Sequence, residues 1–342
     1  MAFSHSRQLV DWMRHETISF AFTSYQTGRL FLVGVDKNRQ LSMLQRAFTR
    51  AMGLHAGEQH LYVADLYQLW RFDNVLAQGE VYNGEFDRLY VPRLGYTTGD
   101  LDIHDIGIGA DGKPIFVNSL YSCLATISEV ASFRPLWKPP FVSKLAAEDR
   151  CHLNGLAMAG DRPCYATAVS RSDAVEGWRD RKHDGGILIE VSTGEIVSKG
   201  LSMPHSPRVR DGKIWLLNSG TGWLGYVDPA AGTFEPVTFC PGFLRGLDFH
   251  GRYAIVGTSL PRNIGFVGLE LDANLKARDT EPRCAVLIVN LETGDVVHWL
   301  TFESHIIELY DVAFLPGVRH PMHLGFQTNE IRQYITMEGR LD

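Results

Sequence analysis

His104-Asp-Ile-Gly-Ile (104–108), His152-Leu-Asn-Gly-Leu (152–156) and His205-Ser-Pro-Arg-Val (205–209) begin three similar stretches of this sequence. In each stretch a histidine opens a short run, a turn that contains glycine follows, and a second apolar run comes next. Short runs joined by tight turns are typical of antiparallel hairpins. The three stretches therefore predict three equivalent hairpins, each with a histidine at the start of its first strand.

The same pattern recurs seven times along the chain. The paired runs are 18–25 with 30–35, 52–55 with 61–64, 103–108 with 114–118, 154–159 with 164–169, 205–210 with 214–218, 246–249 with 253–258, and 310–315 with 322–327. Second hairpins follow over 187–199, 223–239 and 285–301. Two hairpins make one four-stranded propeller blade. We therefore expect an all-β fold, a β-propeller with seven blades. Six blades are the alternative, if one hairpin belongs to a neighbouring sheet.

The domain organisation follows from length and pattern. The chain has 342 residues, of which 45% are hydrophobic, and closed all-β folds of this size form one domain. We expect a single propeller over residues 16–342 and an N-terminal helical extension over 1–15. Within that extension, residues 6–15 have Leu9, Val10 and Met13 on one side of a short amphipathic helix.

Composition narrows the possible partners and the compartment. The net charge of −6 gives no basic surface for a nucleic acid. No apolar run reaches the length of a membrane span, and the first residues lack the apolar segment of a secretory signal. The five cysteines form no CxxC pair. These features predict a cytoplasmic protein without nucleic-acid or membrane partners.

The long segments of the chain predict which face of the propeller is functional. They are 84–101, 128–151, 172–185 and 261–283, and each falls at a connection on the face where the predicted histidine strands begin. Functional loops gather where a rigid scaffold presents them. Trp137 and Trp178 lie in these segments, where they could form a wall over a site or cap the core.

Ring closure would bring His104, His152 and His205 together, because equivalent strands of a propeller meet at its axis. Glu308 has the same position in the last repeat. Nitrogen ligands with one carboxylate suit a divalent transition metal; we favour Fe(II), with Zn, Mn or Cu as alternatives, over Ca²⁺. The competing interpretation is that each histidine lines the channel and bonds to water or backbone.

Other polar residues near the strand starts could complete such a site. We assign Glu308, Asp105, Tyr310 and Asp311 to catalysis, and Arg208, Arg245, Arg150 and Asn154 to substrate binding. Arginines near the axis of an acidic protein suggest a carboxylate or phosphate group held by two hydrogen bonds. The alternative is that these arginines pair with nearby carboxylates such as Glu148, Asp149 and Asp248.

Several stretches of the chain resemble an uncharacterised bacterial family of propeller-like proteins. They are 99–105, 148–157, 203–208, 241–247 and 308–312, and some members of that family are fused to tetratricopeptide repeats. This resemblance implies the architecture and brings no activity. A more remote analogy is to the carotenoid-cleavage oxygenases, seven-bladed propellers that hold iron on the axis with four histidines, whereas three are aligned here.

We therefore expect an oxidoreductase-type, metal-dependent enzyme with its centre at the mouth of the propeller channel. The favoured reaction is non-haem iron oxidation of a small anionic molecule or a peptide side chain, because open coordination positions could bind O₂ or activate water. A zinc-type hydrolase or lyase is the first alternative. A non-catalytic propeller that binds a protein or peptide is the second.

Overall fold

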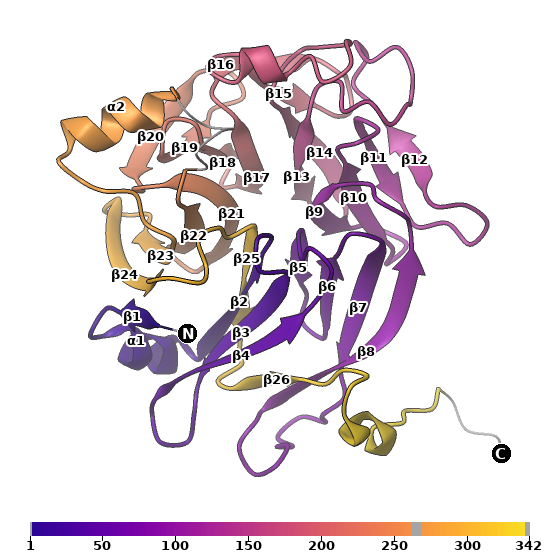
Figure 1. Cartoon of the computed structure of the whole chain (residues 1–342), viewed down its shortest axis with the longest axis vertical. Coiled ribbons are helices and arrows are strands. Elements are labelled where there is room, and N and C mark those ends of the chain that lie inside the picture. The colour runs from indigo at the N-terminus through magenta and orange to yellow at the C-terminus, as the bar shows by residue number, and fades with distance from the viewer. Residues whose placement is uncertain (1, 262–267, 339–342) are drawn as a thin grey trace.

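Six sheets stand around a common axis in the computed structural model, which describes residues 2–261 and 268–338 (Figure 1). In each sheet one strand lies next to the axis and the others lead outward to the rim. The arrangement is a β-propeller, as the repeated hairpins predict. It has six blades, so the favoured number of seven is wrong and the alternative of six is correct.

We number the blades in chain order and give their strands from the axis to the rim. Blade 1 contains β25 (Asp311–Pro316), β2 (Ile18–Ser24), β3 (Arg29–Val35) and β4 (Leu41–Ala47). Blade 2 contains β5 (Leu54–Ala56), β6 (His60–Ala64), β7 (Gln68–Asn74), β8 (Arg88–Thr97) and β26 (Pro321–His323). Blade 3 contains β9 (Ile103–Ile108), β10 (Pro114–Asn118), β11 (Cys123–Thr126) and β12 (Arg134–Trp137).

The remaining blades complete the ring. Blade 4 contains β13 (Leu153–Ala159), β14 (Arg162–Ala168), β15 (Gly186–Glu190) and β16 (Ile196–Leu201). Blade 5 contains β17 (Pro204–Arg210), β18 (Lys213–Asn218), β19 (Trp223–Val227) and β20 (Phe234–Phe239). Blade 6 contains β21 (Phe243–His250), β22 (Tyr253–Ser259), β23 (Ala285–Asn290), β24 (Asp295–Phe302) and β1 (Phe3–His5).

The ring closes through the two ends of the chain, and this closure removes the expected seventh blade. Strand β25 from the last repeat pairs antiparallel with β2 from the first, with Ala313 opposite Ala21. The first and last repeats are therefore two parts of blade 1. The run at 322–327, expected to pair with 310–315, instead contributes β26, which lies parallel to β8 on the rim of blade 2.

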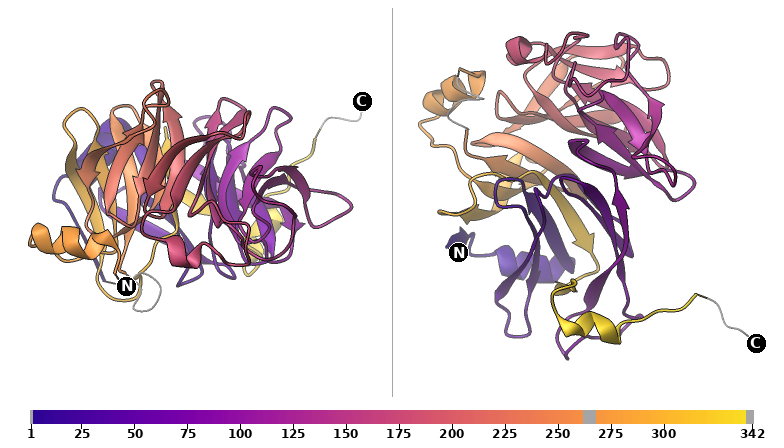
Figure 2. Two further views of the ribbon diagram at one scale, coloured as in Figure 1. Left: turned by 90° about the horizontal axis from the view of Figure 1, so that it is seen from above. Right: turned by 45° about the vertical axis from the view of Figure 1, so that its right-hand side comes forward.

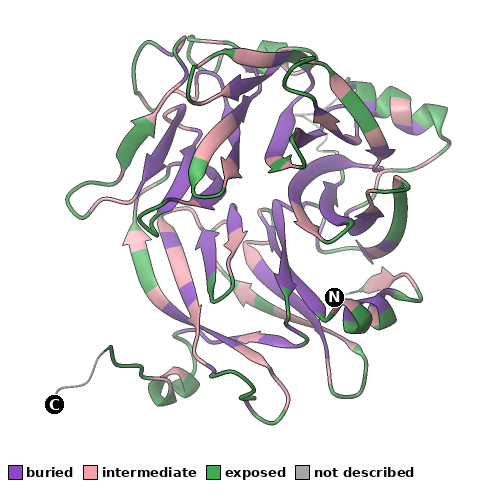
Figure 3. Ribbon diagram, turned by 180° about the vertical axis from the view of Figure 1, so that it is seen from behind, coloured by how far each residue is buried: buried purple, intermediate pink, exposed green. Residues whose placement is uncertain are grey.

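The strands near the axis are buried on both faces because each blade packs against a neighbour on either side. All but the last residue of β9 and all of β10 are buried, and β9 includes the polar residues His104 and Asp105 among them. The outermost strands β4 and β12 carry mostly half-buried and exposed residues. Figure 3 shows this gradient, with buried strands around the centre and exposed residues towards the rim.

The long segments of the sequence contain elements that the repeat pattern did not predict. The segment 84–101 contains β8, and 128–151 contains β12, so both include an outer strand of a blade. The segment 172–185 contains the 3-10 helix η1 (Arg179–Arg181), and 261–283 contains helix α2 (Glu270–Ala277). Helix α2 and η1 lie at the same end of the blades (Figure 2).

The N-terminal residues join the propeller instead of standing apart from it. The short helix expected over 6–15 forms as α1 (Leu9–Glu16), and it buries Leu9, Trp12 and Met13 against blades 1 and 6. Strand β1 adds a fifth strand to blade 6. The described C-terminal segment includes a second 3-10 helix, η2 (Asn329–Gln333). Among the described residues, no helix has the length and apolar character that a membrane crossing requires.

Candidate functional site at the mouth of the channel

His104 and His205 occupy equivalent positions in blades 3 and 5. Each is the second residue of its inner strand, β9 or β17. The preceding strand residues, Ile103 and Pro204, lie opposite Asn118 and Asn218 on the second strands. The sequence repeat therefore predicted this pair in the correct register.

The two histidines also share one pattern of hydrogen bonds, which fixes their tautomer. His104 Nδ1 lies 2.9 Å from the carbonyl oxygen of Asp102 and 2.7 Å from Ser119 Oγ. His205 Nδ1 lies 2.8 Å from the carbonyl oxygen of Met203 and 3.1 Å from Ser219 Oγ. A carbonyl oxygen can only accept, so Nδ1 carries the hydrogen in both rings. The Nε2 atom of each neutral ring keeps its lone pair.

His152 comes from a different position in blade 4. Leu153 lies opposite Ala168, so Asn154 has the register of His104 and His205, and His152 lies two residues earlier. Its φ of 49° matches those of Asp102 (53°) and Met203 (46°) in the other blades. The expected alignment of the three histidines is therefore wrong by two residues for His152. Its side chain nevertheless reaches the other two.

His152 has its own anchor, supplied by the loops. His152 Nδ1 donates to Asp149 Oδ2 at 2.8 Å, and Trp178 Nε1 donates to the same oxygen at 2.8 Å. The Trp178 ring also stacks on the imidazole, with the ring centroids 4.2 Å apart. Burial alone would raise the pKa of Asp149, but the adjacent His152 and both hydrogen bonds lower it. Asp149 is thus a carboxylate that orients His152.

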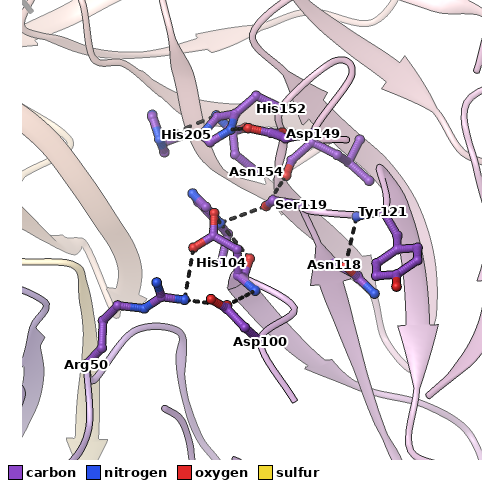
Figure 4. Close-up of polar contacts among 12 residues, drawn as sticks. Arg50, Asp100, His104, Asn118, Ser119, Tyr121, Asp149, His152, Asn154 and His205 are labelled. Atoms are coloured by element: carbon purple, nitrogen blue, oxygen red, sulfur yellow. Dashed lines mark hydrogen bonds and ion pairs between the residues drawn. The ribbon is translucent and has the colours of Figure 1, made fainter. Parts of the chain in front are cut away.

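The three imidazoles lie together at the axis (Figure 4). The centroid of the His104 ring is 4.9 Å from that of His152 and 6.4 Å from that of His205. Burial lowers the pKa of His104 to about 4 and that of His205 well below its usual value. These two rings are therefore uncharged at neutral pH, with Nε2 atoms that can accept a hydrogen bond or bind a metal ion.

The distance between ring centroids fits a shared ion for the pair His104–His152 and is too wide for the pair His104–His205 as neighbouring ligands. Two neighbouring imidazole ligands of one ion, bound through nitrogen at about 2.1 Å with the angles of tetrahedral coordination or close to them, have centroids roughly 4.5–5.3 Å apart. The pair His104–His152 falls in that range and His104–His205 does not. Within the part of the chain that the structure describes, no group of three His, Cys, Asp or Glu side chains is arranged to hold a metal ion.

Glu308, expected as a fourth ligand or base, is engaged with an arginine. Arg245 Nη1 lies 3.3 Å from Glu308 Oε1, and both side chains are buried. The Arg245 guanidinium lies over the ring of Tyr310 at 4.7 Å and near that of Phe243 at 5.6 Å. Those rings contact His104 and His205 respectively. We call His104, His152 and His205 the histidine cluster. Tyr310 contacts this cluster directly, and Arg245 contacts it through the rings of Tyr310 and Phe243.

Asp105 and Arg208 form a separate pair deeper along the axis. Arg208 Nη1 and Nη2 donate to the two oxygens of Asp105 at 2.8 and 3.1 Å. Asp105 also accepts the backbone N–H groups of Ile106 and Leu156. Beyond this pair is a cavity of about 250 Å³, lined by residues that follow the histidine level along the inner strands.

Asp311 repeats the arrangement of Asp105 in blade 1. It accepts the N–H of Val312 in its own strand and that of Leu54 in blade 2, at 2.9 Å each. Burial, and then the neighbouring Asp105, raise the pKa of Asp311 well above its usual value. The contacts of Asp105, Arg208 and Asp311 are thus links between blades, below the three imidazoles.

Arg150 and Asn154 lie on either side of His152 and have different surroundings. Arg150 pairs with Glu148 at 2.6 Å and with Asp173 at 2.5 Å. The pair with Glu148 agrees with the alternative expectation that the arginines bind nearby carboxylates. Asn154 accepts from Thr167 Oγ1 at 2.9 Å, and its Nδ2 lies 3.4 Å from His205 Nε2. Only Asn154 of these two touches the histidine cluster.

Three residues of the site were not predicted as functional residues from the sequence, namely Ser119, Ser219 and Asp149, and Trp178 was expected as a wall or a cap and not as an anchor of His152. The two serines had a visible signal, because Asn118-Ser119 and Asn218-Ser219 end the second strands of blades 3 and 5 alike. Asp149 and Trp178 had none, because they lie 29 residues apart in loops without regular structure.

Comparison with known proteins assigns the family. Residues 7–324 match the family model described as "Domain of unknown function (DUF4915)". The chain belongs to this family. Its members carry no assigned activity in that description, which agrees with the resemblance to an uncharacterised family of propeller-like proteins. No curated protein matches the sequence.

Solved structures with a similar fold are distant in sequence. A chain in a nidogen–laminin complex is 14% identical, with a TM-score of 0.55 over 88% of this chain and 99% of that one. A protein of unknown function from Bacteroides caccae is 9% identical, with a TM-score of 0.49 over 87% and 98%. A catalytically inactive virginiamycin B lyase from Staphylococcus aureus is 11% identical, with a TM-score of 0.41 over 88% and 100%. The first of these supports the propeller fold alone.

Proposed function

We propose that this DUF4915 chain is a metal-dependent enzyme whose centre is built on His104, His152 and His205. The observation that carries the proposal is the hydrogen-bonding pattern that the three imidazole rings share. In each, Nδ1 donates to an oxygen, so Nε2 is left as the ligating atom. Metal-binding histidines almost always donate their second ring nitrogen in this way.

The ligand set requires one small change, at His205. His104 and His152 already have the spacing of two ligands. His205 Nε2 is held by a single long contact of 3.4 Å from Asn154, which an incoming ion could replace. A bound divalent ion would supply Lewis acidity or O₂ activation, and we favour Fe(II), with Zn, Mn or Cu as alternatives.

The residues around the imidazoles would then set the reaction. Trp178, stacked on His152, and Phe243, against His205, limit the access of water to the rings. Arg245 supplies a positive charge for an anionic substrate. Non-haem iron oxidation of a small anionic molecule or a peptide side chain remains our favoured reaction, and a zinc-type hydrolase or lyase is the alternative within the same proposal.

A second candidate is a metal-free site. Arg245 lies close enough to His104 and His205 for its positive charge to lower the pKa of both rings further, after burial. The same charge would disfavour a bound cation. In that case the imidazoles would act as proton acceptors, or the propeller would bind a peptide or protein without catalysis.

Elemental analysis of the purified chain tests the proposal. We expect about one transition-metal ion per chain in the wild type and a loss of most of it in His152→Ala, because two remaining imidazoles bind weakly. His183→Ala is the matched control, since His183 is exposed in the neighbouring loop. A wild-type chain that stays metal-free after growth and dialysis with Fe(II), Zn²⁺ and Mn²⁺ favours the second candidate.

The remaining expectations concern location and partners. A cytoplasmic location and the absence of nucleic-acid and membrane partners stay predictions from composition. Cell fractionation followed by immunoblotting with an antibody against the chain tests the location, and a signal in the membrane or secreted fraction would contradict it.

A further inference from the structure

Arg245 is a buried cation at the level of the histidines. It lies on β21 of blade 6, and 9% of its side chain is exposed. Its guanidinium lies between two rings, Tyr310 at 4.7 Å and Phe243 at 5.6 Å. The Tyr310 ring lies 5.3 Å from His104, and the Phe243 ring lies 5.6 Å from His205. The guanidinium therefore lies beside the candidate centre, in contact with a ring that touches His104 and a ring that touches His205.

The hydrogen-bonding capacity of Arg245 is largely unused. A guanidinium has five N–H donors. Among the described residues, one of them has a partner, Glu308 Oε1, and that contact is long at 3.3 Å. Arg245 Nε is buried with no partner in the same part of the chain. Arginines at buried positions are normally satisfied by several acceptors, so this one lacks an acceptor group.

Tyr310, whose ring contacts the Arg245 guanidinium, also has an unused hydrogen-bonding group. Its hydroxyl is buried, and no described residue accepts from it or donates to it. A tyrosine hydroxyl keeps its hydrogen at neutral pH, so it can donate. A guanidinium with an unpartnered Nε–H and a tyrosine hydroxyl without a described partner thus belong to two contacting side chains beside His104.

We propose that Arg245 and Tyr310 bind a carboxylate group of the substrate, beside His104 and His205. This inference rests on the proposed function, since it names the substrate class of the same site. A carboxylate provides two oxygens in one plane, which suits the guanidinium edge, and a further lone pair for the Tyr310 hydroxyl.

The charges around the site favour a carboxylate over a phosphate. Arg245 is the cation that contacts the Tyr310 ring, and Glu308 already lies against it. Asp102 Oδ2 lies 3.7 Å from His104 Nδ1, so a second negative charge lies close by. Arg50, which lies over the Tyr25 ring, is paired with Asp100 at 2.6 Å and lies 3.6 Å from Asp102. A dianion would meet these carboxylates, whereas a monoanion needs one positive charge.

Calorimetry on the chain treated with EDTA tests the inference without any metal or turnover. The probes are acetate, pyruvate and benzoate, with inorganic phosphate for comparison. We expect the wild type to bind at least one carboxylate at millimolar concentrations and to bind phosphate at least tenfold more weakly. Arg245→Lys should weaken carboxylate binding at least tenfold, because lysine cannot form the two-point contact.

Two further variants separate recognition from a general effect on the fold. Tyr310→Phe keeps the ring under Arg245 and removes only the hydroxyl, so we expect a three- to tenfold loss of affinity with an unchanged thermal midpoint. Arg252→Lys is the matched control, because Arg252 also lies over a tyrosine ring, that of Tyr253 at 5.4 Å, and 3.5 Å from a glutamate, but half of its side chain is exposed. It should bind the probes as the wild type does.

The outcomes distinguish this inference from the proposed metal centre. If a carboxylate binds to a chain that holds no metal under any condition, the inference stands and the metal centre fails. If the chain binds a metal but no carboxylate, or if Arg245→Lys and Tyr310→Phe bind the probes like the wild type, the inference is overturned. Equal binding of phosphate would overturn the assignment to carboxylates.

Discussion

His104 and His205 are held by the same pair of partners in two different blades, a backbone carbonyl and a serine hydroxyl. These partners accept from the protonated Nδ1 and leave Nε2 for a ligand. Both rings are buried, so each would have to be charged in a poorly solvated place if it bound a proton. The folded chain therefore keeps them neutral, and acid should oppose folding.

This gives a prediction for stability against pH. The pKa of His104 is lowered to about 4 in the folded chain, whereas the pKa of a histidine in the unfolded chain is about 6.5. Between these values the unfolded chain binds more protons, so stability falls as the pH falls from about 6.5 towards 4. In His104→Gln, the loss of unfolding free energy over that window should be smaller by about 1.4 kcal/mol per pH unit. Urea unfolding at several pH values measures this slope. His183→Gln should retain the wild-type slope, and the same slope in His104→Gln would contradict a neutral buried ring.

Asp149 gives a second prediction at this scale. Asp149→Asn keeps the shape of the side chain and removes the negative charge of the group to which His152 and Trp178 both donate hydrogen bonds. We expect the apparent Kd for a bound metal to rise roughly 10- to 100-fold, with little change in Tm, because the ligand is less firmly oriented. Metal titration against a competing chelator measures the affinity, and Asp161→Asn, on the exposed turn of the same blade, is the control. An affinity equal to that of the wild type would remove Asp149 from the site.

His104 and His205 could be predicted from the sequence because their strands repeat in register. His152 was predicted for an incorrect reason, since Asn154 has the equivalent position and His152 lies two residues earlier. Ring closure gathers side chains from both positions at one end of the axis. The anchors of His152 lie in loops, where neither spacing nor propensity indicates which residues will meet.

At the scale of elements, the inner strands were predictable and several outer strands were not. Strands β9 and β10, the two nearest the axis in blade 3, were expected with the bounds that the structure has, and both are buried on both faces. Strand β12 carries exposed residues at three of four positions, so its apolar pattern is too weak to indicate a strand. The outer strands owe their conformation to the neighbours with which they pair.

Helix α1 provides the prediction at this scale. Trp12 is buried between blades 1 and 6, with ring centroids 5.2 Å from Tyr253 and 6.3 Å from Phe314. Trp12→Ala should therefore lower the free energy of unfolding of the whole chain by about 3–5 kcal/mol. Guanidinium unfolding measures the loss, and Val10→Ala on the same helix should cost much less because Val10 is only partly buried. Fraying of the helix alone, with an unchanged main transition, would show that α1 is an appendage.

For the whole molecule, the decisive contact joins the two ends of the chain. The six β25 residues from Asp311 to Pro316 pair one for one with residues 18–23 of β2. The sequence predicted seven blades because these strands belong to separate repeats. No local sequence pattern indicates that two incomplete repeats share one sheet. The number of blades is thus a property of the closed ring, which the repeat pattern alone did not determine.

Hydrogen exchange tests how firmly this closure holds. We expect the backbone amides of β25 and β2 to exchange at rates within roughly tenfold of those in β17 and β18, because a closed ring opens as one cooperative unit. Mass spectrometry of exchanged peptides measures the four strands together. Exchange in β25 and β2 that is faster by several orders of magnitude would mean that the ring opens at its seam without unfolding.

We propose that three imidazoles, from blades 3, 4 and 5, present their Nε2 atoms to one ligand. A zinc titration of the chain with ¹⁵N-labelled histidine, followed by NMR, tests this arrangement. We expect the Nε2 signals of His104, His152 and His205 to shift together and to saturate at one ion per chain, while Nδ1 stays protonated in all three. Zinc binding that leaves these signals unmoved, or that saturates them at different ratios, would contradict it.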